Sequence, residues 1–148
     1  MKRLSVIVLF LMAGWLGATE PGDKAVHEEL KKLEGTWEYI AQEVGGKKSP
    51  DNNFKGVTLT IKDDTYTIQV VGIVSDRGTI KVDPANTPKT IDKVSSKLKD
   101  VKYFGIYKFD GDTLYLCESI GERPEHRPKD FTTTKGTPEV LVTLRRKK

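Results

Sequence analysis

Hydrophobic and polar residues alternate with a period of two over most of the chain after Thr36. Neighbouring side chains of a strand point to opposite faces, so this alternation is typical of strands with one buried face. Turn residues divide the pattern into eight predicted strands, at residues 36–44, 57–62, 65–71, 78–83, 89–95, 102–109, 112–118 and 139–145. Asp63-Asp64 and Asp110-Gly111 mark the turns of two hairpins, the second with the type I′ preference.

A helical period precedes the strands. Val26, Leu30 and Leu33 share one helix face, Asp23 is placed to cap the N-terminus, and Gly35 is placed to end the helix. The apolar stripe is too narrow for a free-standing helix. We therefore expect a short N-terminal helix that packs against, or plugs one end of, the β-structure.

The strands together predict one continuous apolar face. Its members are Val57, Leu59, Ile61, Tyr66, Ile68, Val70, Ile80, Val82, Leu114, Leu116, Val140, Val142 and Leu144. Eight antiparallel strands with such a face hide their edges most simply by closing into a barrel, and a two-sheet sandwich is the alternative. We predict an all-β, eight-stranded antiparallel barrel with one short N-terminal α-helix, in a single domain over residues 20–148.

Residues 1–19 have the composition of a secretory signal peptide. Lys2 and Arg3 precede an apolar run over residues 4–16, and small residues follow at 17–19. A membrane-anchoring helix is the alternative, but the run is shorter than the roughly 20 residues of a bilayer span. We expect removal on export, with the protein periplasmic or extracellular. Removal takes two positive charges from a formal net charge of +4 and leaves +2.

The remaining charges are mixed rather than gathered. Lysine and arginine alternate with aspartate and glutamate, and the one basic cluster is the tail at residues 145–148. Nucleic-acid-binding proteins collect basic residues on one face, so the sequence argues against a nucleic-acid partner. Cys117 is the only cysteine, which excludes an internal disulfide. Its place in the strand at 112–118 predicts a buried, unreactive thiol.

Several motifs resemble an exported lipocalin-like domain family of unknown function that is abundant in planctomycete-type bacteria. They are ELKKLEGTW at 29–37, GTIKVDP at 78–84, PKTID at 88–92, GIYKFDGDTL at 105–114 and GERP at 121–124. In lipocalins a Gly-x-Trp motif opens the first strand, and an arginine of the last strand packs on its tryptophan. The resemblance therefore implies a barrel, an exported location and structural roles for Gly35, Trp37 and Arg145, with Arg146 the alternative partner of Trp37. It implies no catalytic residue.

The motifs of common metal, cofactor and catalytic sites are absent from the sequence. His27 and His126 have no second histidine or cysteine at metal-ligand spacing. His126, between Glu122 and Glu125, is the one candidate general base, and an exposed loop histidine is the simpler interpretation. Phosphate-binding glycine loops and nucleophile-elbow motifs are missing. We expect no cofactor and no metal, and an enzyme is the least favoured hypothesis.

The favoured function is non-enzymatic binding of a small apolar or amphipathic ligand inside the barrel. Tyr66 and Tyr107 are predicted to supply inward hydroxyl groups. Arg123 and Arg127 lie in the long connection at 121–138, whose prolines stiffen it, and are the candidate contacts for an anionic group at the barrel mouth. The alternative, which we favour, is that Arg123 pairs with a strand carboxylate and pins this connection.

A second hypothesis is an interaction module of the cell envelope. It would meet an envelope protein or an anionic polymer through the strand surface or the basic tail. For either hypothesis we expect a monomer.

Overall fold

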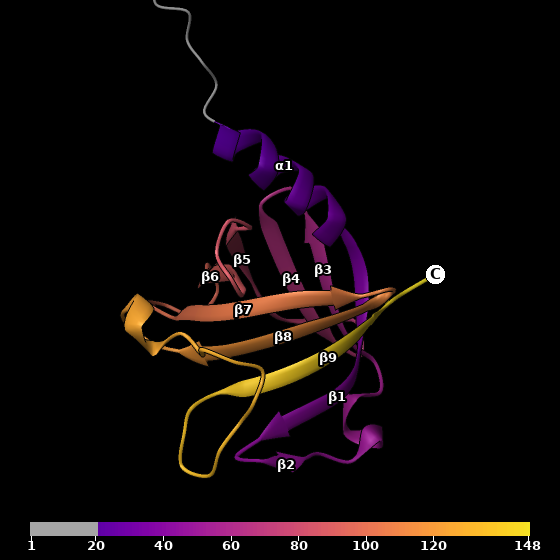
Figure 1. Ribbon diagram of the computed structural model, residues 1–148. Helices are drawn as coiled ribbons and strands as arrows, with labels where there is room; N and C mark the ends of the chain where they lie inside the picture. Colours follow the sequence, from indigo (N-terminus) through magenta and orange to yellow (C-terminus); the bar gives the residue numbers. More distant parts are fainter. Residues whose placement is uncertain (1–20) are drawn as a thin grey trace, which may run out of the picture.

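The structure is a computed structural model that describes residues 21–148, and it contains a closed antiparallel β-barrel with one helix (Figure 1). The predicted signal peptide at residues 1–19 lies outside the described residues. Eight strands close the barrel and one short extra strand pairs with the first. The predicted fold class is confirmed.

The strand order is sequential, so every barrel neighbour is antiparallel. The strands are β1 (Gly35–Val44), β2 (Lys47–Lys48), β3 (Val57–Lys62), β4 (Thr65–Val70), β5 (Ile73–Asp83), β6 (Lys89–Ser95), β7 (Lys102–Asp110), β8 (Thr113–Ile120) and β9 (Val140–Arg146). Two short 3-10 helices, at Asp51–Phe54 and Pro124–His126, interrupt the connections. β2 and both 3-10 helices were not predicted.

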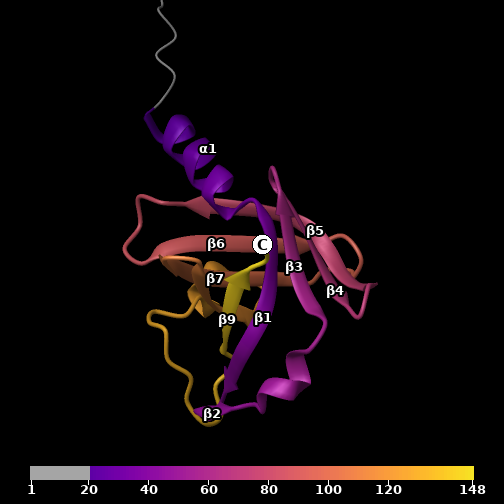
Figure 2. The ribbon, with the colours of Figure 1, turned by 90° about the vertical axis from the view of Figure 1, so that its right-hand side faces the viewer.

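The last strand closes the barrel against the first. β1 pairs with β9 from Trp37 opposite Arg146 to Val44 opposite Val140, with a register shift between Tyr39 and Ala41. Figure 2 shows these two strands side by side. Closure leaves no free edge on the eight barrel strands, which removes the main hazard of an open sheet.

The helix α1 (Pro21–Leu33) lies at one end of the barrel (Figures 1 and 2). Within the described residues α1 starts at Pro21, so Asp23 lies in a helical turn and is not the predicted N-cap. Val26 and Leu30 pack against the barrel core, and Leu33 is fully buried. The predicted apolar stripe therefore serves to cover this end.

Glu29 is a carboxylate buried beneath the same helix. It accepts hydrogen bonds from Lys89 Nζ at 2.6 Å, Lys32 Nζ at 3.2 Å and the Tyr107 hydroxyl at 3.2 Å. Burial acts to raise the pKa of Glu29, but the two lysines outweigh it and hold the pKa below its ordinary value. The charged carboxylate thus ties α1 to β6 and β7.

An arginine of the last strand joins the helix to the first strand. The Arg146 guanidinium lies 4.1 Å from the centroid of the buried Trp37 ring. It also donates to the Glu34 carbonyl at 2.6 Å and to the Lys32 carbonyl at 2.7 Å, two acceptors at the C-terminal end of α1. Trp37 Nε1 donates to the Leu33 carbonyl at 2.8 Å. These bonds satisfy backbone acceptors that a helix end leaves without partners.

This contact belongs to Arg146, which corrects the assignment to Arg145. Leu144 is buried inside the barrel, so alternation along β9 turns Arg145 outward, where it is exposed. Gly35 has the expected structural role: its φ is +124°, and an added Cβ would lie 2.8 Å from Arg146 Nη1. A side chain at Gly35 would therefore displace the guanidinium.

Replacing Arg146 with alanine is expected to lower the free energy of unfolding by about 2–4 kcal/mol, because two charge-assisted hydrogen bonds and a cation–π contact are lost. Urea unfolding followed by circular dichroism measures the change. The matched control is Arg145→Ala, which removes an exposed arginine of the same strand and should change stability by less than about 0.5 kcal/mol. Equal effects of the two variants would contradict the assignment.

Candidate functional site

The candidate site is a pocket at the barrel end opposite α1. β1 starts beside the helix, so the connections β1–β3, β4–β5, β6–β7 and β8–β9 all emerge at this other end, called here the open end. A pocket of about 270 Å³ opens there. Its lining residues are Tyr39, Gln42, Tyr103, Glu118, Ser119, Ile120, Pro138, Val140 and Val142. The lining thus combines aliphatic side chains with hydroxyl, amide and carboxylate groups.

Behind the pocket, Asp76 is buried among neutral hydrogen-bond donors. Its carboxylate accepts from Ser95 Oγ at 2.6 Å, from the Tyr66 hydroxyl at 2.8 Å and from the Tyr103 hydroxyl at 3.3 Å. The backbone N–H of Arg77 donates a further bond at 2.8 Å. Burial acts to raise the pKa of Asp76, but these hydrogen bonds outweigh it and hold the pKa below its ordinary value. Asp76 is therefore charged at neutral pH.

Lys93 and Glu118 form an ion pair beside Asp76. Lys93 is only 2 % exposed, and its Nζ lies 2.9 Å from each carboxylate oxygen of Glu118. The ammonium also lies 4.7 Å from the Tyr103 ring centroid and 5.2 Å from that of Tyr66. Two carboxylates and one ammonium leave this cluster with a net charge of −1.

Glu118 is the member of this cluster that reaches the pocket. Its side chain is 13 % exposed and lines the cavity, whereas Lys93 does not line it. Oε1 accepts a hydrogen bond from Lys93, and the buried Oε2 lies 2.9 Å from the same ammonium without a hydrogen bond of good geometry. One ammonium therefore serves both carboxylate oxygens of Glu118.

The tyrosines of the open end act as neutral groups. Burial raises the pKa of Tyr103 to about 12, with the nearby Asp76 and Glu118 charges adding to the shift. Burial likewise raises the pKa values of Tyr39 and Tyr66 well above the ordinary value. Their hydroxyl groups therefore keep their protons at any physiological pH, and those of Tyr66 and Tyr103 donate to Asp76.

The two tyrosines predicted as ligand contacts lie deeper than the pocket. Tyr66 is 1 % exposed, and its hydroxyl is engaged by Asp76. Tyr107 is also 1 % exposed and belongs to the helix end, where its hydroxyl donates to Glu29. Neither lines the open-end pocket. Tyr39 and Tyr103 line the pocket instead.

The two predicted loop arginines do not face the barrel mouth. Arg127 Nη1 donates to Asp92 Oδ1 at 2.5 Å and to the Gly105 carbonyl at 2.8 Å, and its guanidinium lies 5.6 Å from the Phe104 ring centroid. Phe104 points outward from the barrel because its neighbour Tyr103 lines the pocket. Arg127 thus pins the β8–β9 connection to the outer surface, the role that the alternative gave to Arg123, which is exposed.

The environments of Cys117 and His126 were also predicted from the sequence. Cys117 is fully buried, and burial raises the pKa of its thiol to about 12, which confirms the predicted buried thiol. The Ser119 hydroxyl donates to the His126 carbonyl. The His126 side chain is exposed and makes no ion pair with Glu122 or Glu125 in the described part of the chain. Within residues 21–148, no cluster of His, Cys, Asp and Glu is arranged to hold a metal ion.

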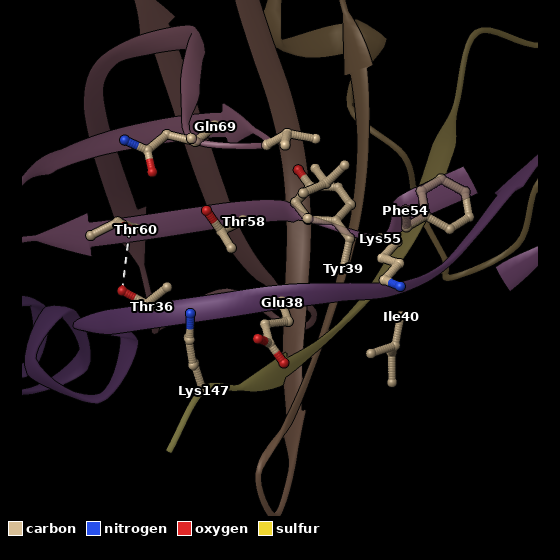
Figure 3. Close-up of a pocket in the computed structure, with 14 residues that line it drawn as sticks. Thr36, Glu38, Tyr39, Ile40, Phe54, Lys55, Thr58, Thr60, Gln69 and Lys147 are labelled. Atoms are coloured by element: carbon tan, nitrogen blue, oxygen red, sulfur yellow. Dashed lines mark hydrogen bonds between the residues drawn. The ribbon is translucent and has the colours of Figure 1, made fainter. Parts of the chain in front are cut away.

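A larger cleft of about 800 Å³ lies on the outer surface of β1, β3 and β4 (Figure 3). It forms because β1 and β3 pair only as far as Glu38 and Thr58 and then separate. Figure 3 shows short polar side chains along it, with the Thr36 and Thr60 hydroxyls in contact at 3.2 Å. Tyr39 lines both this cleft and the open-end pocket. Its side chain therefore fills the gap between the diverging strands.

Sequence reasoning missed the charged residues of the site, namely Asp76, Lys93 and Glu118. Each occupies an inward position in the alternation, two residues from inward partners such as Ile91 and Leu116. The sequence signal for these residues was therefore a charged residue at a position that the alternation places inside the barrel. β5 was predicted to start at residue 78 for the same reason, since its inward residue Asp76 breaks the apolar pattern.

No helix within residues 21–148 is both long enough and apolar enough to span a membrane. Comparisons of the chain with protein-family models, with curated proteins and with solved structures gave no match.

Replacing Asp76 with asparagine is expected to destabilise the protein most at neutral pH. A carboxylate with a depressed pKa stabilises the fold above its unfolded-state pKa, near 3.8, and this stabilisation is lost as pH falls through the folded-state pKa. The difference in unfolding free energy between wild type and Asp76→Asn should therefore shrink as the pH falls below about 4. Urea unfolding across this pH range measures it, and a difference independent of pH would contradict the role assigned to the Asp76 charge.

Proposed function

We propose that this chain is an exported, lipocalin-like binding domain that takes a small amphipathic ligand through the open end of the barrel. The observation that carries the proposal is the pocket itself, whose lining combines aliphatic side chains with Glu118, Tyr39 and Tyr103. Pockets of this mixed character, apolar with a few fixed polar groups, are typical of small-molecule sites. Export and the lipocalin-like family are proposed from the sequence motifs.

The size of the pocket supports a small ligand. Its volume of about 270 Å³ equals that of roughly nine water molecules in the liquid. The rest of the interior is filled by a packed core of almost wholly buried side chains, including Trp37, Leu59 and Leu116. A long lipid chain does not fit the barrel without rearrangement of this core, whereas a short alkyl or ring group does.

The charge of the pocket supports a ligand that donates hydrogen bonds. The lining supplies a carboxylate, and the only buried ammonium behind it, Lys93, already contacts Glu118. A ligand carboxylate would meet the negative cluster, whereas a ligand ammonium would pair with Glu118 beside the faces of two tyrosines. The proposed ligand therefore carries a cationic group, in place of the anionic ligand group that Arg123 and Arg127 were expected to contact.

The proposal predicts that octylammonium binds more tightly than octanoate, which has the same chain length and the opposite charge. Isothermal titration calorimetry at neutral pH compares the two ligands. Glu118→Gln should lower octylammonium affinity by about 10- to 100-fold, because a charge-assisted hydrogen bond becomes a neutral one. Val140→Phe, which enlarges one aliphatic side chain of the lining, should weaken both ligands.

Glu122→Gln is the matched control, because Glu122 is an exposed glutamate of the β8–β9 connection outside the pocket. It should leave both affinities unchanged. Tighter binding of octanoate would refute the polarity of the site. Absence of binding by both ligands, with no small molecule in an organic extract of the natively purified protein, would refute the binding function.

A further inference from the structure

The exposed apolar side chains of the described residues gather at the open end. Seven large hydrophobic residues are exposed, and all except Val94 lie where strands end or turn at that end. We call these six residues the rim; they are Val44, Val70, Val71, Ile73, Leu98 and Ile120. They come from four separate chain segments that surround the mouth of the barrel. Single exposed hydrophobic residues are ordinary, but their concentration around one opening is not.

The β4–β5 turn is the most exposed part of the rim. Val71 is 74 % exposed and Ile73 is 75 % exposed. Val71 also has a φ of +51°, a region that β-branched residues avoid because of steric conflict. Its backbone N–H donates to the Gly56 carbonyl at 2.8 Å, which fixes the turn. A strained, exposed valine contributes nothing to the core, so a role outside the fold accounts for it.

Lysines flank this turn on both sides. Lys55 precedes Gly56, the residue that accepts the Val71 hydrogen bond. On the other side, Lys97 Nζ donates to the Val74 carbonyl at 2.5 Å, and Lys99 follows in the same β6–β7 connection as Leu98. The rim therefore combines apolar side chains with exposed ammonium groups.

The turns at the helix end carry exposed aspartates at 63–64, 83, 110 and 112. The helix end also carries the lysines of α1 and the basic tail at 145–148, and the open end also carries the exposed acids Asp100, Glu122 and Glu125. The two ends therefore differ in exposed apolar side chains rather than in net charge, and attraction to an anionic surface is assigned to the lysines that flank the β4–β5 turn.

We propose that the open end of the barrel docks on a lipid bilayer that carries anionic headgroups. Lysines near such a surface gain electrostatic attraction, and apolar side chains gain by entering the boundary between headgroups and acyl chains. The rim side chains project from separate turns around an opening, which suits a deformable bilayer better than a rigid protein surface. Docking places the pocket mouth against the bilayer and does not depend on the ligand proposed above.

Vesicle co-sedimentation tests the proposal. The protein is recovered after expression of the full chain, its N-terminus is determined by mass spectrometry, and the same form is used for every variant. Sucrose-loaded vesicles contain phosphatidylcholine alone or phosphatidylcholine with phosphatidylglycerol. We expect binding to the mixed vesicles that weakens with added salt, because screening shortens the reach of the lysines. Equal binding to both kinds of vesicle, or to neither, would overturn the proposal.

Two pairs of variants assign the binding to the rim. Val71→Asn with Ile73→Thr should lower the partition coefficient at least tenfold and keep the fold, because asparagine tolerates a positive φ. Lys97→Gln with Lys99→Gln should also lower it about tenfold or more. The controls are Val94→Thr, an exposed valine outside the rim, and Lys24→Gln with Lys31→Gln on α1.

The controls should bind vesicles as the wild type does, and urea unfolding should show that all variants are folded. Undiminished vesicle binding by both rim variants would overturn the proposal. So would a rim-dependent complex with a protein partner in the absence of vesicle binding, which would make the rim a protein interface.

Discussion

The contact of Arg146 with Trp37 is the constraint on which the arrangement of the molecule depends. It joins the last strand, the first strand and the end of α1 at one point, through the ring of Trp37 and the carbonyls of Lys32 and Glu34. Gly35 is required there because a Cβ would meet the guanidinium. Once this end is fixed, α1 covers it with its apolar stripe, and the open-end pocket lies at the opposite end. The position of the candidate pocket therefore follows from the way in which the barrel is closed.

The interior beyond this closed end is not built for stability alone. Asp76, Lys93 and Glu118 are charged residues at positions where other strands carry leucine, isoleucine or valine. Removing charges from water is costly, and well-packed hydrophobic residues often stabilise a protein as much as a buried ion pair does. Asp76 compensates by accepting four hydrogen bonds, whereas both carboxylate oxygens of Glu118 rely on the one ammonium of Lys93. A carboxylate with so few donors at a pocket is consistent with the ligand contact proposed above.

The local alternation of apolar and polar residues was sufficient to predict the fold, because nearly all inward positions are apolar. The bounds of β3 and β6 match the predicted ones. The alternation was insufficient where the pairing register between strands decides which side chains face inward. A shift of one residue turns a strand over, and the pairing of Trp37 with Arg146 shows which of two adjacent arginines faces inward. Lys93 and Glu118 lie on strands separated by β7, and they meet beside Gly105, where an added Cβ would lie 3.1 Å from that of Glu118. Arg127 lies in a connection whose path no periodicity describes, so its contact with Asp92 had no local signal.

The rim and the pocket share one residue, Ile120, and meet at one opening. Ile120 is exposed at the end of β8 and also lines the cavity. An amphipathic solute pays about 0.8 kcal/mol for each CH₂ group that it exposes when it leaves a bilayer for water. A mouth bordered by valine, isoleucine and leucine side chains that enter the bilayer interface would let the alkyl part of a ligand pass between the two apolar environments without that exposure. In that arrangement Glu118, which lines the pocket, would receive the polar group of the ligand at the inner end of the path. Transfer of an amphipathic molecule from a membrane would require an apolar opening that leads to a polar interior. The rim and the pocket have this order along the proposed path.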